Sequence, residues 1–80
     1  MGVHVPDYMY AIETDDMVNI REQPDDNSNA LSQAVAGERL MAAYEVEGGQ
    51  YGGSRPGSSW YPVQYGAIEG YVAAGYVRVV

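Results

Sequence analysis

Few side chains in this sequence have the chemistry of a catalytic nucleophile or base. The chain has no cysteine and a single histidine, His4. A serine hydroxyl needs a nearby base before it attacks a substrate, and no such base accompanies the serines at positions 28, 32, 54, 58 and 59. The sequence therefore predicts that the protein is not an enzyme.

Carboxylates are the other reactive groups. Asp15-Asp16 and Asp25-Asp26 are adjacent pairs, and such pairs in turns usually face solvent. Asp25-x-Asn27-x-Asn29 imitates the start of an EF-hand calcium loop, but Ala30 stands where that loop needs glycine and Ala36 where it needs glutamate. A polar turn is the preferred interpretation, with weak calcium binding as the alternative. We expect no metal site and no cofactor.

The aromatic residues are the best candidates for a binding site. The chain has eight tyrosines, one tryptophan and no phenylalanine. Tyrosine hydroxyls need a partner or water, which indicates half-exposed aromatic surface. Such rings stack on sugars and peptide backbones and dominate interface hot spots. The expected ligand- or partner-binding residues are Tyr51, Trp60, Tyr61, Tyr71 and Tyr76.

The alternative is that these rings simply fill a small core. That interpretation is preferred for Tyr44 and Tyr65. Both interpretations stay open for Trp60, Tyr61 and Tyr71. The ring at position 51 lies between glycine pairs and has little structural reason to be there, so we expect it to reach a partner.

Charge narrows the class of partner. The chain has four arginines, no lysine and 11 acidic residues, for a net charge of −7. This charge opposes binding to nucleic acid phosphates or to anionic lipid head groups. A basic or neutral partner is favoured, with solubility alone as the competing explanation. No stretch approaches the roughly 20 apolar residues of a membrane span, and the N-terminus lacks the pattern of a secretory signal.

Short strands must position these residues. An apolar–polar period of two predicts strands over 8–13, 17–21, 39–46, 60–65, 67–72 and 76–80. Gly37 and Gly66 are the expected turn glycines, and Ala73-Ala74-Gly75 is expected to form one helical turn. Residues 1–9 are expected to form an N-terminal arm, and residues 10–80 one barrel domain.

Two connecting segments are less regular. Residues 22–29 are polar and contain Pro24, so they cannot form a central strand. A short helix is a competing prediction for 28–36, where alanine and leucine are frequent. Residues 47–59 contain two glycine pairs and are expected to form a long flexible loop.

Several motifs, taken in order, resemble the bacterial SH3 domain family. The matching residues are Val18-Asn19-Ile20-Arg21 with Pro24, Leu31, Gly37, Trp60-Tyr61 with Val63, Gly70-Tyr71-Val72 and Tyr76-Val77. The similarity covers about residues 10–79. Glu22-Gln23 departs from the small residue and glycine that are usual there, and the 47–59 segment is longer than usual.

The resemblance implies an all-β, SH3-like, partly open barrel of about five to seven short antiparallel strands, with a short helical turn before the last strand. It also implies a non-catalytic role. Members typically target cell-wall peptide or glycan, or pack against a neighbouring domain or subunit.

Two functions stay open. The first expectation is a small accessory structural subunit of a larger assembly such as a phage particle, located in the virion, or in the cytoplasm before assembly. Val3, Val5 and Tyr8 would contact neighbouring subunits through the arm. The alternative is a cell-wall (peptidoglycan) targeting module of a bacterial or phage hydrolase, at the bacterial cell surface within a larger exported protein. No motif distinguishes the two, and nothing specific supports a third role as an intracellular adaptor.

Overall fold

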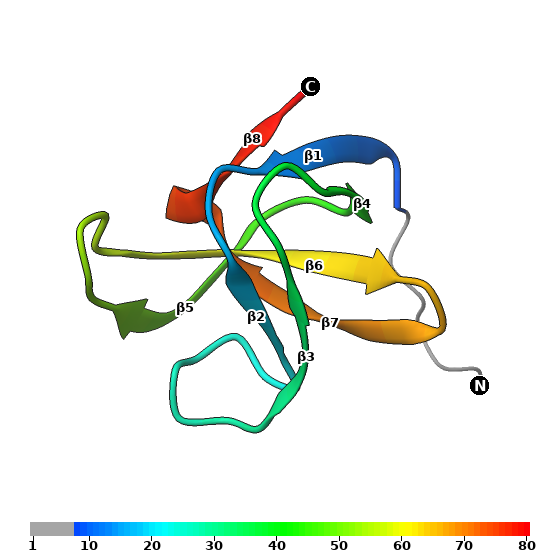
Figure 1. Ribbon diagram of the computed structural model, residues 1–80. Helices are drawn as coiled ribbons and strands as arrows, with labels where there is room; N and C mark the ends of the chain where they lie inside the picture. The colour runs from blue at the N-terminus through cyan, green and yellow to red at the C-terminus, as the bar shows by residue number, and fades with distance from the viewer. Residues whose placement is uncertain (1–7) are drawn as a thin grey trace.

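A computed structural model describes residues 8–80 and shows a small all-β domain (Figure 1). It contains eight short antiparallel strands and one 3-10 turn. The elements are β1 (Tyr10–Thr14), β2 (Val18–Arg21), β3 (Ala30–Ala34), β4 (Arg39–Ala42), β5 (Val46–Tyr51), β6 (Gly57–Tyr65), β7 (Ile68–Ala73), η1 (Ala74–Tyr76) and β8 (Val77–Val79).

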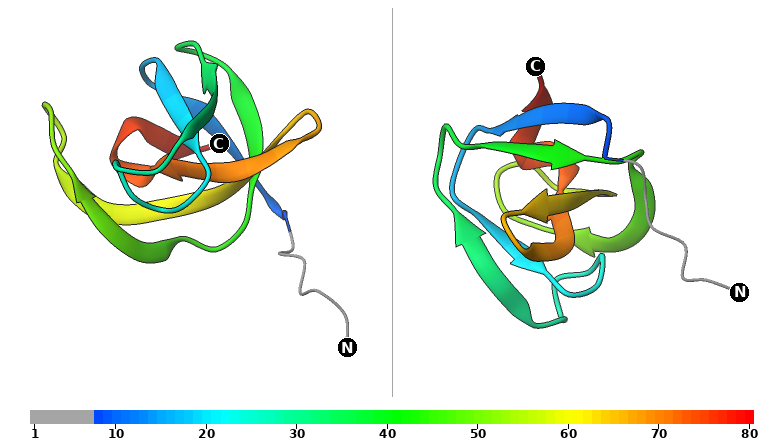
Figure 2. Two further views of the ribbon diagram at one scale, coloured as in Figure 1. Left: turned by 90° about the horizontal axis from the view of Figure 1, so that it is seen from below. Right: turned by 90° about the vertical axis from the view of Figure 1, so that its right-hand side faces the viewer.

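The strands form one strongly curved sheet in the order β3-β2-β7-β6-β4-β1-β8, and β5 pairs with β6 beside this path. Figure 2 shows how the sheet curls around the molecule's centre. In residues 8–80 no pairing joins β3 to β8, so the barrel is partly open, as the sequence predicted. The described part of the chain has no helix long and apolar enough to cross a membrane.

The core follows the alternation read from the sequence. On β2, Val18 and Ile20 are buried while Asn19 and Arg21 are half-buried. The buried cluster draws on β1, β2, β3, β4, β6, β7 and β8, and its members are Ile12, Val18, Ile20, Ala34, Leu40, Ala42, Val63, Val72 and Val77. A period of two therefore places one face of each strand inside the barrel.

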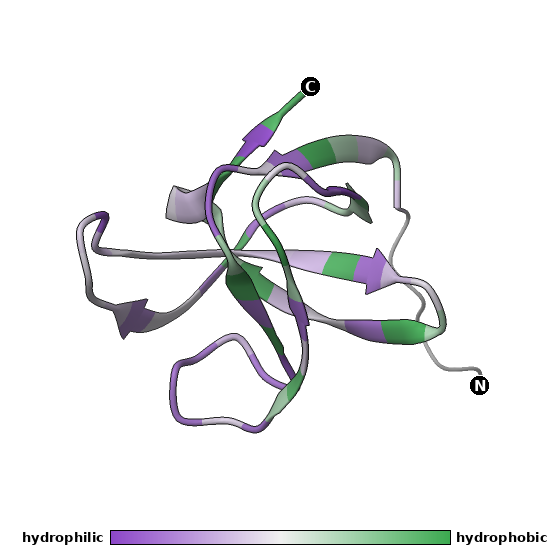
Figure 3. Cartoon of the chain, in the orientation of Figure 1, coloured by the Kyte–Doolittle hydropathy of each residue, from purple (hydrophilic) through white to green (hydrophobic). Residues whose placement is uncertain are grey.

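The turn predictions are confirmed. Gly37 and Gly66 have φ angles of 83° and 62°, in the left-handed region that glycine enters without steric cost. The helical turn before the last strand is η1. The loop at 22–29 is irregular and largely hydrophilic (Figure 3).

Two predictions about the elements were wrong, and the competing helix prediction is excluded. The helix considered for 28–36 is absent, because residues 30–34 form β3 and pair with β2. The strand predicted over 39–46 breaks after Ala42. The predicted flexible loop at 47–59 contains β5 and the first part of β6, which pair with each other. This hairpin raises the number of strands to eight, above the five to seven expected.

The glycines at 48 and 49 explain the last error. A side chain at Gly48 would overlap the backbone oxygen of Pro24 and approach Trp60 Cδ1 to 2.7 Å. One at Gly49 would lie 2.9 Å from Cβ of Asp25. These glycines therefore allow the loop at 22–29 to pack closely on β5.

Candidate functional site

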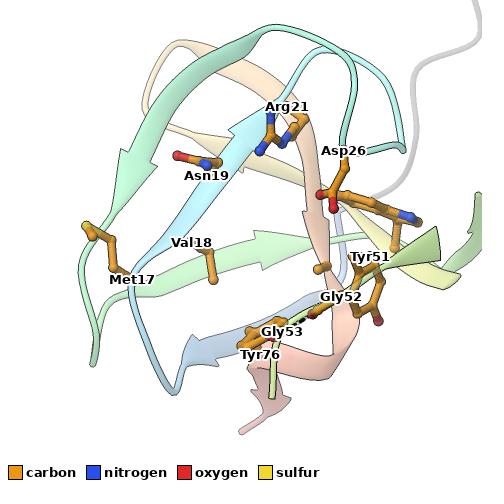
Figure 4. Close-up of a pocket in the computed structure, with 11 residues that line it drawn as sticks. Met17, Val18, Asn19, Arg21, Asp26, Tyr51, Gly52, Gly53 and Tyr76 are labelled. Carbon is orange, nitrogen blue, oxygen red and sulfur yellow. Dashed lines mark hydrogen bonds between the residues drawn. The ribbon is translucent and has the colours of Figure 1, made fainter. Parts of the chain in front are cut away.

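A pocket of about 320 Å³, here called the groove, opens between the 22–29 loop and the β5–β6 turn (Figure 4). β2 forms one side of the groove, and β7 and η1 contribute to its base. Its lining residues are Met17, Val18, Asn19, Arg21, Asp26, Tyr51, Gly52, Gly53, Trp60, Ala73 and Tyr76.

Three aromatic rings form one wall of the groove. The ring centroids of Tyr51 and Trp60 are 5.2 Å apart, and the planes meet edge-to-face at 85°. The centroids of Tyr51 and Tyr76 are 6.1 Å apart at a tilt of 54°. Such contacts are the favoured geometry for aromatic pairs, so each ring fixes the orientation of the next.

The polar atoms of this wall are hydrogen-bonded within the chain. The Tyr51 hydroxyl donates to the backbone oxygen of Ser59 at 3.0 Å and accepts from the backbone N–H of Gly75 at 3.0 Å. The Tyr76 hydroxyl donates to the backbone oxygen of Gly52 at 2.9 Å. The hydroxyls are therefore committed to the fold, and because Tyr51 and Trp60 are buried, the half-buried Tyr76 is the ring of this wall that can face a ligand.

Charged groups of both signs complete the groove. Arg21 extends from β2, and its Nη1 donates to the backbone oxygen of Ser28 at 3.0 Å. Asp26 lies exposed on the 22–29 loop, and both residues line the groove with Asn19. This set supports noncovalent recognition of a ligand that carries both an anionic and a cationic group.

The structure does not support calcium binding by the 22–29 loop. Asp25 Oδ1 accepts a hydrogen bond from the backbone N–H of Asn27 at 2.8 Å, which is the geometry of a polar Asx turn. Across residues 8–80, no group of three or more histidine or acidic side chains is arranged to hold an ion.

The structure brings together three of the five predicted binding residues, Tyr51, Trp60 and Tyr76. The other two lie elsewhere: Tyr61 lines a second, smaller pocket, and Tyr71 is half-buried on β7 and lines neither pocket.

The prediction that Tyr51 has little structural reason to exist was wrong. Its side chain is only 6% exposed and is packed between Trp60 and Tyr76. A side chain at Gly57 would meet the Tyr51 hydroxyl at 2.8 Å. The glycine-rich surroundings thus accommodate a buried ring.

The expected arm contacts are only partly described. Val3 and Val5 lie outside the described residues. Tyr8 is half-buried near β7. Burial raises the pKa of its phenol, and the charge and hydrogen bonding of Glu69 raise it further, with a smaller contribution from Tyr71.

The two tyrosines assigned to the core behave differently. Tyr65 is half-buried against the core and donates to Glu38 Oε1 at 2.9 Å. Tyr44 is 69% exposed, so its assignment was wrong. Ala42 and Ala43 are both buried in succession, and this extra inward residue turns the next side chain outward.

The polar residues of the groove were not predicted from the sequence. Asn19 and Arg21 could have been identified from the sequence, because the alternation along β2 already placed them on the outer face. Asp26 could not have been identified in this way, since its approach to the groove depends on how the 22–29 loop folds back over β5.

Searches of curated proteins and of solved structures returned no significant match. Residues 16–78, from the end of the first turn to the last strand, match the bacterial SH3 domain. This match agrees with the eight-stranded antiparallel sheet and the 3-10 turn before β8. The chain belongs to the bacterial SH3 domain family, whose members are non-catalytic binding modules.

Proposed function

We propose that this domain binds a short peptide in the groove and that the peptide belongs to the bacterial cell wall. The observation that carries the proposal is the placement of the half-buried Tyr76 ring, packed on the buried Tyr51, in one groove with Arg21 and Asp26. Aromatic rings stack on peptide backbone, and the two charges pair with carboxylate and ammonium groups of the same ligand.

The size and charge of the groove favour a peptidoglycan stem peptide over a glycan polymer. At about 320 Å³ the groove is near the lower limit for small-ligand sites. Stem peptides carry free carboxylates and an amine, which matches the mixed charge of the lining. The net charge of −7 opposes binding to anionic wall polymers. This function would place the domain at the cell surface within an exported protein.

Co-sedimentation with purified peptidoglycan tests this function. We expect the full chain to pellet with the wall material and Arg21→Gln to pellet several-fold less. Arg39→Gln is the matched control, because Arg39 is exposed and contacts Glu13 outside the groove. A chain that stays in the supernatant contradicts the proposal, as does equal loss in the two variants. Circular dichroism of each variant separates lost binding from lost folding.

A second candidate is an accessory subunit of a larger assembly such as a phage particle. It is favoured by apolar side chains left exposed in the isolated chain, because such surface often marks protein interfaces. These side chains are Met9, Met17, Leu31, Val35, Met41, Tyr44, Val46, Val79 and Val80. In that case the domain would reside in the virion, with the N-terminal arm reaching a neighbour.

Analytical ultracentrifugation of the full chain, alone and with peptidoglycan, separates the two candidates. A monomer that sediments with the wall material supports the targeting module. An oligomer that ignores the wall material supports the assembly subunit and contradicts the first proposal.

A further inference from the structure

A second pocket, of about 170 Å³, lies apart from the groove and shares none of its lining residues. It is lined by Tyr10, Tyr44, Glu45, Tyr61 and Val79. We call these five residues the tyrosine cage.

Sheet register explains why residues so distant in sequence meet. The strands β8, β1, β4 and β6 are consecutive neighbours in the sheet (Figure 1). Tyr10 pairs with Ala42 on β4, and Ala42 pairs with Val63 on β6. Two residues beyond Ala42 is Tyr44, and two residues before Val63 is Tyr61, so three adjacent segments each place a tyrosine at one end of the sheet.

Two of the three rings that line this pocket are in contact with each other. The Tyr10 and Tyr44 ring centroids are 5.5 Å apart, and the planes meet at 71°. Tyr10 and Tyr61 pack against the hydrophobic core, which fixes their positions. Tyr44 is largely exposed, so it completes the cage without contributing to the buried cluster.

The single charge in the cage is negative. Glu45 belongs to it, and in residues 8–80 no basic side chain lies within salt-bridge distance of that carboxylate. Arg39, Arg55 and Arg78 pair instead with Glu13 or Asp15. The remaining arginine, Arg21, lines the groove.

The pKa values of Tyr10 and Tyr61 agree with this geometry. Burial raises the pKa of the Tyr61 phenol, and the negative charge of Glu45 adds to the effect. A hydrogen bond with Tyr44 raises the pKa of Tyr10. Both shifts favour the neutral phenols of Tyr10 and Tyr61, and the pKa shift of Tyr61 shows that Glu45 lies close enough to Tyr61 for its charge to act there.

We propose that the tyrosine cage binds an organic ammonium cation, such as a trimethylammonium or methylated lysine head group. Aromatic faces attract cations through the ring quadrupole, and aromatic cages recognise quaternary ammonium groups in this way. Glu45 supplies the opposite charge. The pocket is smaller than the roughly 300 Å³ of sites for drug-sized ligands, a size that suits one head group. The site is independent of the groove and of its proposed peptide.

NMR titration of the full chain with choline tests the proposal. The probe for comparison is 3,3-dimethylbutanol, which has the same shape but no charge. We expect saturable shifts at Tyr10, Tyr44 and Tyr61 with choline and none with the neutral alcohol at equal concentration. Equal shifts with both compounds, or no saturable shift with choline, would overturn the proposal.

Two variants assign the binding to the cage. Tyr44→Ala removes an exposed ring and should weaken choline binding about tenfold, the scale of one cation–π contact. Glu45→Gln should weaken it several-fold, whereas Glu22→Gln, an equal change of charge on the exposed 22–29 loop, should have no effect. Similar weakening by both glutamate variants would mean that net charge alone attracts the cation, and would contradict a built site.

The source of the ammonium group is tested separately. Short peptides containing trimethyllysine, lysine or alanine at one position are titrated in the same way. Tighter binding of the trimethyllysine peptide than of choline identifies a side chain of a protein partner, and the reverse identifies a free small molecule. Binding of the alanine peptide at the cage with equal affinity would contradict ammonium recognition.

Discussion

The indole N–H of Trp60 donates a hydrogen bond of 2.8 Å to the backbone oxygen of Gly49. The bond joins β6 to β5, and Gly49 in turn donates from its backbone N–H to the oxygen of Pro24 at 2.9 Å. Trp60 is only 1% exposed. Two consecutive hydrogen bonds therefore link Trp60, through Gly49, to the 22–29 loop that borders the groove.

Replacement of Trp60 should unfold the domain before it reports on binding. Trp60→Ala is expected to reduce the free energy of unfolding by about 3–5 kcal/mol, because it leaves a large cavity. That loss is a large part of the stability of so small a domain. Trp60→Phe keeps a ring but loses the bond to Gly49, and should cost about 1–2 kcal/mol. Urea unfolding measures both, and a phenylalanine variant as stable as the wild type would contradict the role of the bond.

Gly48→Ala should destabilise the domain by about 1–3 kcal/mol, as overpacking does elsewhere. The added methyl group would collide with the backbone oxygen of Pro24 and with the Trp60 ring. Gly52→Ala is the matched control, because a Cβ there meets nothing within 4 Å. Thermal unfolding should separate the two variants by several degrees. Equal melting temperatures would show that the 22–29 loop moves aside at little cost.

The fold could largely be predicted because its signals are local. Alternation on β2 and the glycines at 37 and 66 depend on backbone geometry within a few residues. The β5–β6 hairpin was not predicted, because its glycines were interpreted as a sign of flexibility. Gly48 and Gly49 are needed where a distant loop packs on β5, and a sequence pattern cannot separate close packing from flexibility.

Only part of the candidate site could be predicted, because residue type is a local signal and packing is not. Tyr51, Trp60 and Tyr76 were identified from residue type, yet the structure explains them first as packed and hydrogen-bonded side chains. Tyr44 was assigned to the wrong side of its strand, because two consecutive inward alanines change the alternation. Errors of one residue in register reverse every later side chain, and this one concealed the tyrosine cage.

Stability should fall at alkaline pH through the tyrosines. The phenols of Tyr8, Tyr10, Tyr61 and Tyr65 have pKa values raised above 10.0 in the folded chain. A raised pKa means that folding favours the protonated phenol, so this stabilisation is present below pH 10 and is lost as the pH rises through the folded values. The chain has no lysine or cysteine, so the change above pH 10 reports on the tyrosines.

Tyr65 provides the specific test of this pH dependence. Its pKa is raised first by the hydrogen bond to Glu38, then by burial and by the charge of that carboxylate. Thermal unfolding between pH 8 and 11 should show a smaller alkaline loss for Tyr65→Phe than for the wild type. An unchanged dependence in the variant would indicate that the bond to Glu38 does not favour the protonated phenol.

The hydroxyl of Tyr76 should order the β5–β6 turn beside the groove. It donates to the backbone oxygen of Gly52 and accepts from the backbone N–H of Arg55 at 3.2 Å, so it ties η1 to the β5–β6 turn. Tyr76→Phe keeps the ring in the groove but removes both bonds. We expect a loss of about 1 kcal/mol in unfolding free energy, faster amide exchange of the turn, and weaker binding to peptidoglycan, because the ligand must then order the turn itself.

Tyr71→Phe is the matched control for that variant. It removes a hydroxyl from a half-buried tyrosine that lines neither pocket. It should therefore leave both the exchange rates of the β5–β6 turn and the binding to peptidoglycan unchanged.

If Tyr76→Phe retains wild-type exchange at Arg55 while its binding falls, the hydroxyl contacts the ligand directly. If exchange rises and binding stays constant, the order of the turn is irrelevant to the ligand, whose contacts then lie on β2 and the 22–29 loop.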